Sequence, residues 1–281
     1  MDLNTVEQLI PATGREAVDA FEPGDAWLAG GSALFAWPDP KLRRLVDITA
    51  LGWRALTATD AGLDIAATCT IAELADYGTH PPPAEWPALA IVRGCCEALR
   101  GSFKVWNVGT VGGNICASLP AGPMTSLAAG LGAECLIWQP GGGERRAAVA
   151  DVVIGDCVNA LAPGELLRSI HVPADVLRGR AAIRQGSLTP MGRSASLLIA
   201  RVPPADLAGE APAFTLVITA AVARAVTLEF AEVPTPAELD AAIEARLVLG
   251  DYFADPHGTP RWRRHLVRLH ARELLEELTG A

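Results

Sequence analysis

The sequence predicts an α+β protein whose C-terminal part is built around a mostly antiparallel sheet. Three observations lead to this fold class. Apolar residues make up 50% of the chain, which is enough to fill real cores. Hydroxyl residues followed three positions later by glutamate mark helix starts, whereas short β-branched runs between turn residues indicate strands. The length of 281 residues exceeds what one core usually holds, so we expect two or three compact units.

The first unit is expected to contain a helix and a strand that ends in glycines. Thr13 and Glu16 match a capping box, which predicts a short helix through about Phe21. Residues 27–29 predict a strand that runs directly into Gly-Gly-Ser at residues 30–32. Successive N–H groups in such a turn are suited to holding a pyrophosphate.

Paired glycines are also common in ordinary tight turns, and alone this segment would be read in that way. It does not form a G-x-G-x-x-G fingerprint, and Asp47 matches only loosely the acidic residue that follows in a dinucleotide-binding unit. A nicotinamide-binding Rossmann domain is therefore disfavoured.

The central part mixes helices with short strands. Thr70 and Glu73 form a second capping box, which predicts a helix to about Tyr77. Apolar spacing predicts a helix that begins at Glu85 or Pro87 and runs to Leu99, with Gly101 just past its end. Another helix is expected over 123–131, and strands over residues 45–48, 63–67, 135–138, 145–149 and 165–172.

A second glycine-rich turn is expected directly after the helix over residues 87–99. It consists of Thr110, Val111, Gly112, Gly113 and Asn114. Adjacent glycines have no Cβ and allow positive φ, so the backbone can approach a ligand closely. We therefore expect phosphate or cofactor binding here.

The C-terminal part is expected to begin near Pro173. Strands are predicted over residues 181–184, 196–202, 214–220 and 225–230. Thr235 and Glu238 cap a helix with Pro236 at its first position, and a final helix is expected over 261–278. The predicted units are therefore residues 1–55, 56–173 and 174–281.

The net charge and the absence of targeting signals indicate which partners and which location to expect. A net charge of −9 argues against nonspecific binding to nucleic acid or anionic membranes, since both depend on basic surface. The N-terminus lacks the pattern of a signal peptide, and no apolar run reaches the length of a membrane span. We expect a cytoplasmic protein without membrane insertion, whose partners are proteins and small molecules.

Six cysteines are scattered without a C-x-x-C pair. Buried free thiols in a reducing cytoplasm are the better interpretation, so neither a metal site nor an iron–sulfur cluster is expected in this chain. Cys116 is close enough in sequence to the second glycine pair to lie near its ligand.

In the order of these segments, the chain resembles the FAD-binding (medium) subunit of molybdenum hydroxylases, the xanthine dehydrogenase and carbon monoxide dehydrogenase family. The segment 107–114 is the most specific match, and segment 29–34 falls at the expected distance before it. Further matches cover nearly the whole chain, at residues 45–48, 68–73, 140–146, 163–170 and 262–263.

The resemblance implies a two-subdomain FAD-binding fold of the vanillyl-alcohol oxidase and p-cresol methylhydroxylase type, followed by a small α+β domain. Residues 1–55 and 56–173 would form the subdomains, with FAD between them. The implied cofactor contacts are Trp27, Leu28, Ala29, Gly30, Gly31, Ser32, Ala33, Leu34, Thr110, Val111, Gly112, Gly113, Asn114, Leu167 and Arg184.

In such enzymes the substrate is hydroxylated at a molybdenum cofactor in a large partner subunit. Electrons pass through [2Fe–2S] clusters of a small partner subunit to FAD, and then to NAD or another external acceptor. The resemblance therefore implies an oxidoreductase subunit in a heterotrimer. Because a flavin carries the electron-transfer chemistry itself, no catalytic residue and no metal ligand are expected from this chain.

Three positions depart from the family's pattern. Trp106 stands where an arginine is common, Pro123 where many relatives have aspartate, and Ala33 where an acidic residue is frequent. They motivate a flavin-free structural or assembly subunit as one alternative. A self-contained FAD-dependent oxidase is another, although the sequence offers no evident catalytic groups for it.

Overall fold

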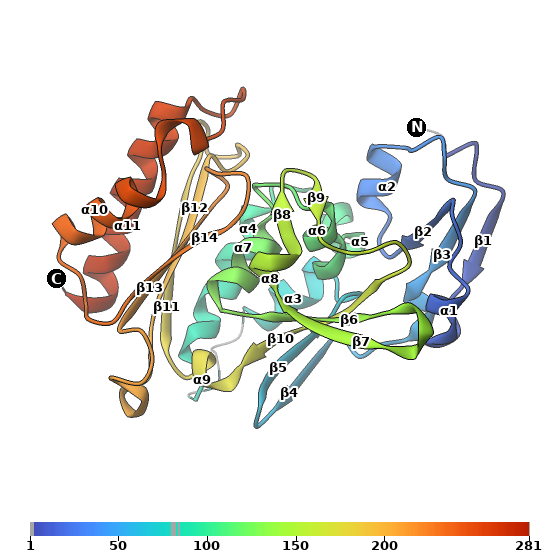
Figure 1. Ribbon diagram of the computed structural model, residues 1–281, viewed down its shortest axis with the longest axis horizontal. Coiled ribbons are helices and arrows are strands. Elements are labelled where there is room, and N and C mark those ends of the chain that lie inside the picture. The colour runs from blue at the N-terminus through green and yellow to red at the C-terminus, as the bar shows by residue number, and fades with distance from the viewer. Residues whose placement is uncertain (1–2, 80–82, 84, 281) are drawn as a thin grey trace.

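The computed structural model describes residues 3–79, 83 and 85–280 of the chain. These residues form three main sheets and a small two-stranded one. The sheets follow one another along the longest axis of the molecule, with the first strands at one end and the C-terminal helices at the other (Figure 1). The mixture of helices with antiparallel sheets confirms the predicted α+β class.

The first sheet is small and parallel. It has the strand order β1-β3-β2, and helix α2 connects β2 to β3. Its elements are β1 (Gln8–Pro11), α1 (Glu16–Asp19), β2 (Asp25–Leu28), α2 (Ser32–Ala36) and β3 (Arg44–Asp47). Ala12, Val18, Val46 and Ile48 form its core together with Leu166 from the next sheet.

The second sheet is antiparallel and has the order β4-β5-β10-β6-β7. Its strands are β4 (Leu56–Thr59), β5 (Gly62–Ala66), β6 (Glu134–Trp138), β7 (Glu144–Ala148) and β10 (Leu166–Pro173). The helices of this part are α3 (Ile71–Tyr77), α4 (Val92–Ala98), α5 (Phe103–Val108), α6 (Val111–Ala117), α7 (Pro123–Gly130), α8 (Val149–Val152) and α9 (Ala174–Leu177). The short strands β8 (Val153–Gly155) and β9 (Val158–Asn159) pair separately.

The third sheet is an antiparallel meander, β11-β12-β13-β14. Its strands are β11 (Arg180–Gly186), β12 (Ser196–Val202), β13 (Phe214–Thr219) and β14 (Val226–Phe230). Helices α10 (Pro236–Arg246) and α11 (Pro260–Thr279) cover its outer face, while α4 and α7 lie toward the inner one (Figure 1). Gly280, with φ of 73°, ends α11 in a left-handed conformation.

Strand β12 is apolar on both faces. Leu197 and Ile199 belong to the central core, whereas Leu198 and Ala200 belong to the core under α10 and α11. Successive side chains of a strand point to opposite faces, so this strand is shared between two cores. The three main sheets fall within residues 1–55, 56–173 and 174–281, and domain limits at these positions remain a proposal.

Several predicted boundaries need correction. The first helix spans only Glu16–Asp19 and has Arg15 at its N-cap, because the Thr13 hydroxyl bonds to the Glu16 carboxylate and not to the helix backbone. Helix α4 ends at Ala98, after a 3-10 turn over Pro87–Ile91, and Gly101 is not its left-handed terminator. The capping boxes at Thr70 and Thr235 are present as predicted.

The predicted second glycine turn is not a turn. Thr110 is the N-cap of α6, and residues 111–114 form the first part of that helix. Neither Gly112 nor Gly113 has a positive φ. Within the described ranges, no helix combines the length and apolar character that crossing a membrane requires.

Candidate functional site

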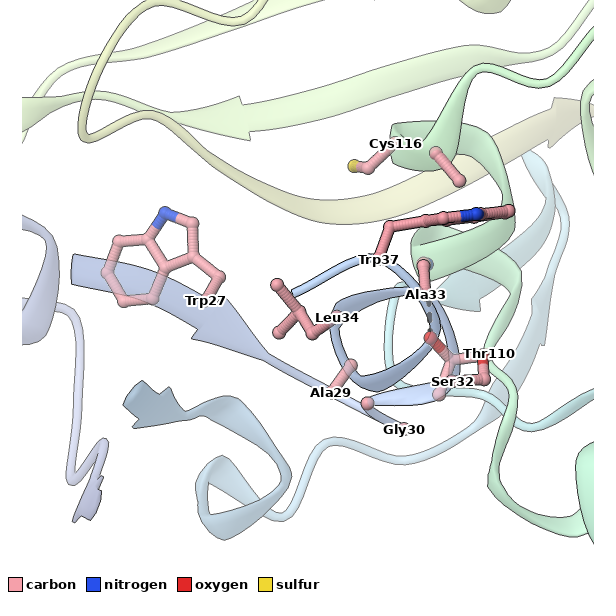
Figure 2. A pocket seen from close by; sticks show the side chains of 12 residues that line it. Trp27, Ala29, Gly30, Ser32, Ala33, Leu34, Trp37, Thr110 and Cys116 are labelled. Atoms are coloured by element: carbon pink, nitrogen blue, oxygen red, sulfur yellow. Dashed lines mark hydrogen bonds between the residues drawn. The ribbon is translucent and has the colours of Figure 1, made fainter. Parts of the chain in front are cut away.

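A cavity of about 330 Å³ lies between α2 and α6, where the first part of the chain meets the second. Figure 2 shows its labelled lining, with Trp27 and Leu34 on one side, Thr110 just before α6 and Cys116 on that helix. The complete lining consists of Trp27, Ala29, Gly30, Gly31, Ser32, Ala33, Leu34, Trp37, Thr110, Gly113, Cys116 and Ala117. The structure thus brings both glycine-rich segments to one cavity, as expected from the sequence.

The α2 wall of the cavity carries open backbone donors. Gly31 is the N-cap of α2, with φ of 70° and no side chain that could cap the helix. The first amides of a helix have no partner inside it. In the part of the chain that the structure describes, the N–H groups of Ser32, Ala33 and Leu34 have no hydrogen-bond acceptor. This wall can therefore donate to an anionic ligand.

The α6 wall is different, because its first amides already have protein partners. Val111 N–H donates to the Cys69 carbonyl (2.8 Å), and Gly112 N–H donates to the Ala67 carbonyl (3.0 Å). Gly113 N–H donates to the Thr110 hydroxyl (3.0 Å). These three amides are therefore not free to bind a ligand, and the contribution of this wall to the cavity is its shape.

Glycine is required at two places where segments of the chain lie in close contact. A Cβ on Gly30 would lie 1.5 Å from the Val108 carbonyl oxygen, and one on Gly112 would lie 2.5 Å from the Ala67 Cβ. Real Cβ atoms do not come this close, so both glycines permit backbone contact between protein segments. Gly30 and Gly113 also line the cavity, whereas Gly112 does not.

Six predicted site residues do not line this cavity: Leu28, Val111, Gly112, Asn114, Leu167 and Arg184. The Asn114 side chain accepts a hydrogen bond from Met124 N–H (3.0 Å) and lines a neighbouring cavity of about 220 Å³. Leu167 is buried in the central core, and Arg184 forms ion pairs with Glu273 and Glu277 of α11. Their assignment as cofactor contacts stays a prediction.

Three lining residues were not predicted as contacts. Trp37 follows α2 and carried no motif signal, while Ala117 belonged to a small-residue segment without further distinction. Cys116 lies on the cavity wall, as its position beside the glycine pair suggested. Burial raises the pKa of its thiol to about 12, so it is protonated at neutral pH.

The prediction of buried cysteines is wrong for Cys157, which is exposed.

The Trp27 indole is hydrogen-bonded to Glu165, which also forms a partly buried ion pair. Its indole N–H donates to the Glu165 carbonyl (3.0 Å), and the Glu165 carboxylate accepts from Arg145 at 2.7 and 2.8 Å. These hydrogen bonds from Arg145 are the main reason that the pKa of Glu165 falls to about 2. Trp27 is therefore hydrogen-bonded to the residue just before β10, and the side chain of that residue is paired with Arg145 of β7.

The lining contains one thiol and two hydroxyls, but no carboxylate, imidazole or amine. Among the described residues, no group of three histidine, cysteine, aspartate or glutamate side chains could hold a metal ion. The cavity therefore offers backbone donors and apolar walls to a bound molecule.

Comparison with solved structures finds the same fold over the whole chain. Quinoline 2-oxidoreductase from Pseudomonas putida 86 matches with a TM-score of 0.80 and 19% identity, over 99% of this chain and 98% of that one. Carbon monoxide dehydrogenase from Hydrogenophaga pseudoflava gives 0.81 and 16%, over 98% of both chains. The reconstituted CO dehydrogenase of Oligotropha carboxidovorans gives 0.81 and 18%, over 100% and 99%.

Comparison with curated protein sequences found no match. The model of one protein family, described as the FAD binding domain in molybdopterin dehydrogenase, matches residues 4–175. This range contains both walls of the cavity, and it covers more than half of the chain. The resemblance expected from the sequence is thereby confirmed: this chain belongs to the family of FAD binding domains in molybdopterin dehydrogenases.

Proposed function

We propose that this chain is the FAD-binding electron-transfer subunit of a molybdenum-containing hydroxylase. Electrons would arrive from [2Fe–2S] clusters of a partner subunit and leave through FAD to an external acceptor. The observation that carries the proposal is the cavity between α2 and α6, which lies inside the range matched by the FAD-domain family.

The residues around the cavity fit the diphosphate of FAD. The amides of Ser32, Ala33 and Leu34 have no acceptor among the described residues, and phosphate oxygens are suitable acceptors for such a group of N–H donors. Opposite them, Gly113 leaves space and Thr110 has its hydroxyl engaged in capping α6. In this proposal α2 holds the charge of the cofactor, and α6 sets the width of the site.

FAD would supply the electron-transfer chemistry when bound, so the protein needs to bind, orient and shield it. Trp27 and Leu34 provide apolar walls, and the Glu165–Arg145 pair fixes the Trp27 indole. Cys116 stays protonated at neutral pH and adds no charge to the cavity. These roles require no acid–base residue from this chain.

The proposed partners are a large molybdopterin-binding subunit and a small [2Fe–2S] subunit, together in the cytoplasm. Two findings support the assembly: membership of a family of FAD domains in molybdopterin dehydrogenases, and full-length structural similarity to a chain of a CO dehydrogenase whose name refers to the molybdenum cofactor. A xanthine dehydrogenase-like activity of the complex belongs to the same proposal.

Titration of the purified chain with FAD tests cofactor binding, and hydrogen exchange locates it. We expect binding to slow exchange of the Ser32, Ala33 and Leu34 amides and to leave those of Val111 and Gly112 unchanged. Ala117→Phe, which fills the cavity from α6, should abolish binding, whereas Ala36→Phe on the exposed side of α2 should not. A folded wild-type chain that takes up no FAD would disprove this function.

A flavin-free structural subunit remains the second candidate, because three positions depart from the family's pattern. The structure gives two of them other roles: the Trp106 indole donates to the Leu99 carbonyl (3.1 Å), and Pro123 is the buried first residue of α7. Neither lines the cavity. Purification of the assembled complex from native cells with molybdenum and iron but without flavin would select this candidate.

A further inference from the structure

Trp37 is an exposed tryptophan at the edge of the cavity. Its backbone N–H donates to the Ala33 carbonyl (2.9 Å) at the end of α2, yet 62% of the residue remains exposed. A single exposed apolar side chain is normal on a protein surface. The location of Trp37, and not its exposure alone, points to a role.

The indole of Trp37 lies where two cavities meet. The main cavity and the neighbouring one of about 220 Å³ are both lined by Trp37. Both are also lined by Ser32, Ala33, Thr110, Gly113 and Ala117. Figure 2 shows the ring edge-on between α6, which carries Cys116, and the Ala33 side of α2. The two faces of the ring are therefore turned toward the walls that α6 and α2 contribute to the two cavities.

The hydrogen bonds of the other nearby indoles set Trp37 apart. Trp27 donates to the Glu165 carbonyl, and Trp106 donates to the Leu99 carbonyl. Within the described residues, the Trp37 indole N–H has no acceptor. Trp37 thus has neither the burial nor the hydrogen bond that holds Trp27 and Trp106 in a structural role.

We infer that Trp37 is a cofactor-positioning residue whose indole stacks on a planar ring of the bound nucleotide. This inference rests on the proposed FAD-binding function and deepens it. Aromatic rings prefer offset-stacked contacts, which add to the energy of burying the ring surface. The open amides of α2 hold the phosphates, and Trp37, at the other end of the same helix, orients the attached ring.

The ring in question is either the flavin or the adenine, and both offer the same planar aromatic surface. Three probes distinguish them: FAD, FMN, which lacks the adenine, and ADP, which lacks the flavin. Affinities are measured on the full chain by titration, and the emission of bound FAD reports whether an indole quenches the flavin.

Trp37→Leu keeps apolar bulk without the aromatic ring, and Trp37→Phe keeps an aromatic ring. We expect Trp37→Leu to weaken FAD binding roughly tenfold and Trp37→Phe by no more than about threefold. Phe103→Ala, at a 74% exposed aromatic on α5 that lines neither cavity, is the matched control and should bind FAD as the wild type does. Thermal unfolding checks that each variant is folded.

Weaker FMN binding with unchanged ADP binding would place the indole on the flavin, with brighter emission of bound FAD in Trp37→Leu. The opposite pattern would place it on the adenine. Equal or tighter FAD binding by Trp37→Leu would overturn the inference and leave the proposed function intact, since the ring would then be a bystander or an obstruction. A wild-type chain that binds none of the three probes would remove both.

Discussion

At the scale of single residues, Gly30 gives the sharpest expectation. Gly30→Ala would place a Cβ 1.5 Å from the Val108 carbonyl oxygen, so backbone must move. We expect a loss of about 2–3 kcal/mol in unfolding free energy and weaker FAD binding, because the two walls of the cavity separate. Chemical denaturation and FAD titration measure both effects.

The matched control is Gly250→Ala, since a Cβ there would meet nothing within 4 Å. Its stability should stay within about 0.5 kcal/mol of the wild type. If Gly30→Ala proves as harmless as this control, the close contact between residues 30 and 108 is not a feature of the folded protein.

Glu165 gives a pH dependence. Hydrogen bonds from Arg145 lower the pKa of Glu165 to about 2 in the folded chain. Because this folded-state pKa lies below the unfolded value of about 4.3, the pair stabilises the protein fully above about pH 5 and loses that effect as pH falls toward about 2. We expect Glu165→Gln to cost about 2–3 kcal/mol at pH 7 and progressively less at lower pH.

Denaturant unfolding between pH 7 and pH 3 measures the difference between wild type and variant at each pH. Glu144→Gln removes a carboxylate whose side chain is 55% exposed and should change stability by less than about 1 kcal/mol. A difference between wild type and Glu165→Gln that does not change with pH would show that the carboxylate is not held by Arg145.

The glycines show how far sequence reasoning reaches at this scale. The Gly30–Gly31 and Gly112–Gly113 pairs both predicted close approach of the backbone to something. In the structure Gly30 and Gly112 approach protein backbone and side chain, while Gly30 and Gly113 both line the cavity. The absence of a Cβ is the same in both cases, so the sequence cannot tell a protein neighbour from a ligand.

At the scale of elements, α6 depends on its cap. Thr110 accepts a hydrogen bond from Gly113 N–H, and its residue exposure is 4%. Thr110→Val keeps the shape but removes the acceptor, which should cost about 1 kcal/mol in unfolding free energy. Thr110→Ser keeps the acceptor and should recover most of this loss in thermal unfolding. Equal stability of the two variants would argue against the cap.

Elements with local signals were predictable, and α6 was not. Thr70 and Thr235 begin their helices through interactions with residues three positions away, which the sequence displays directly. Helix α6 contains two glycines, which disfavour a helix by about 1 kcal/mol each. It forms because Val111 and Gly112 donate to Cys69 and Ala67, and these tertiary partners cannot be read from a local window.

At the scale of the whole molecule, Arg15 joins the first sheet unit to the β6–β7 hairpin. Its guanidinium donates to the carbonyls of Gly142 (2.8 Å) and Gly143, pairs with Glu144, and lies over the Trp138 ring. Arg15→Ala should lower unfolding free energy by about 1–2 kcal/mol and speed proteolysis of residues 139–143. Limited proteolysis with mass spectrometry identifies the cleaved bonds.

Arg93→Ala serves as the control. Arg93 also pairs with a carboxylate, Glu97, and lies over an indole, Trp106, but all three belong to one local region. Cleavage at residues 139–143 should stay at the wild-type rate in this variant. Unchanged cleavage in Arg15→Ala as well would mean that the hairpin is held by other contacts.

The antiparallel C-terminal sheet and its two covering helices followed from alternation and capping in the sequence. The arrangement of the three sheets did not, because it depends on contacts between distant residues. Arg263 illustrates this. It is 1% exposed and donates to the carbonyls of Ala195 (2.7 Å) and Ala220 (3.0 Å), although nothing in its sequence neighbourhood indicates burial.

Because β12 contributes to two cores, the C-terminal part of the chain depends on the central part. Ile199 packs against Gly130 so tightly that a Cβ on that glycine would lie 2.7 Å from it, and Arg201 donates to the Gly130 carbonyl (3.2 Å). Residues 174–281 detached from the rest would expose Leu197 and Ile199 to water. We therefore expect that recombination between relatives yields a stable protein only when residues 174–281 are exchanged together with the central sheet and helices on which they pack.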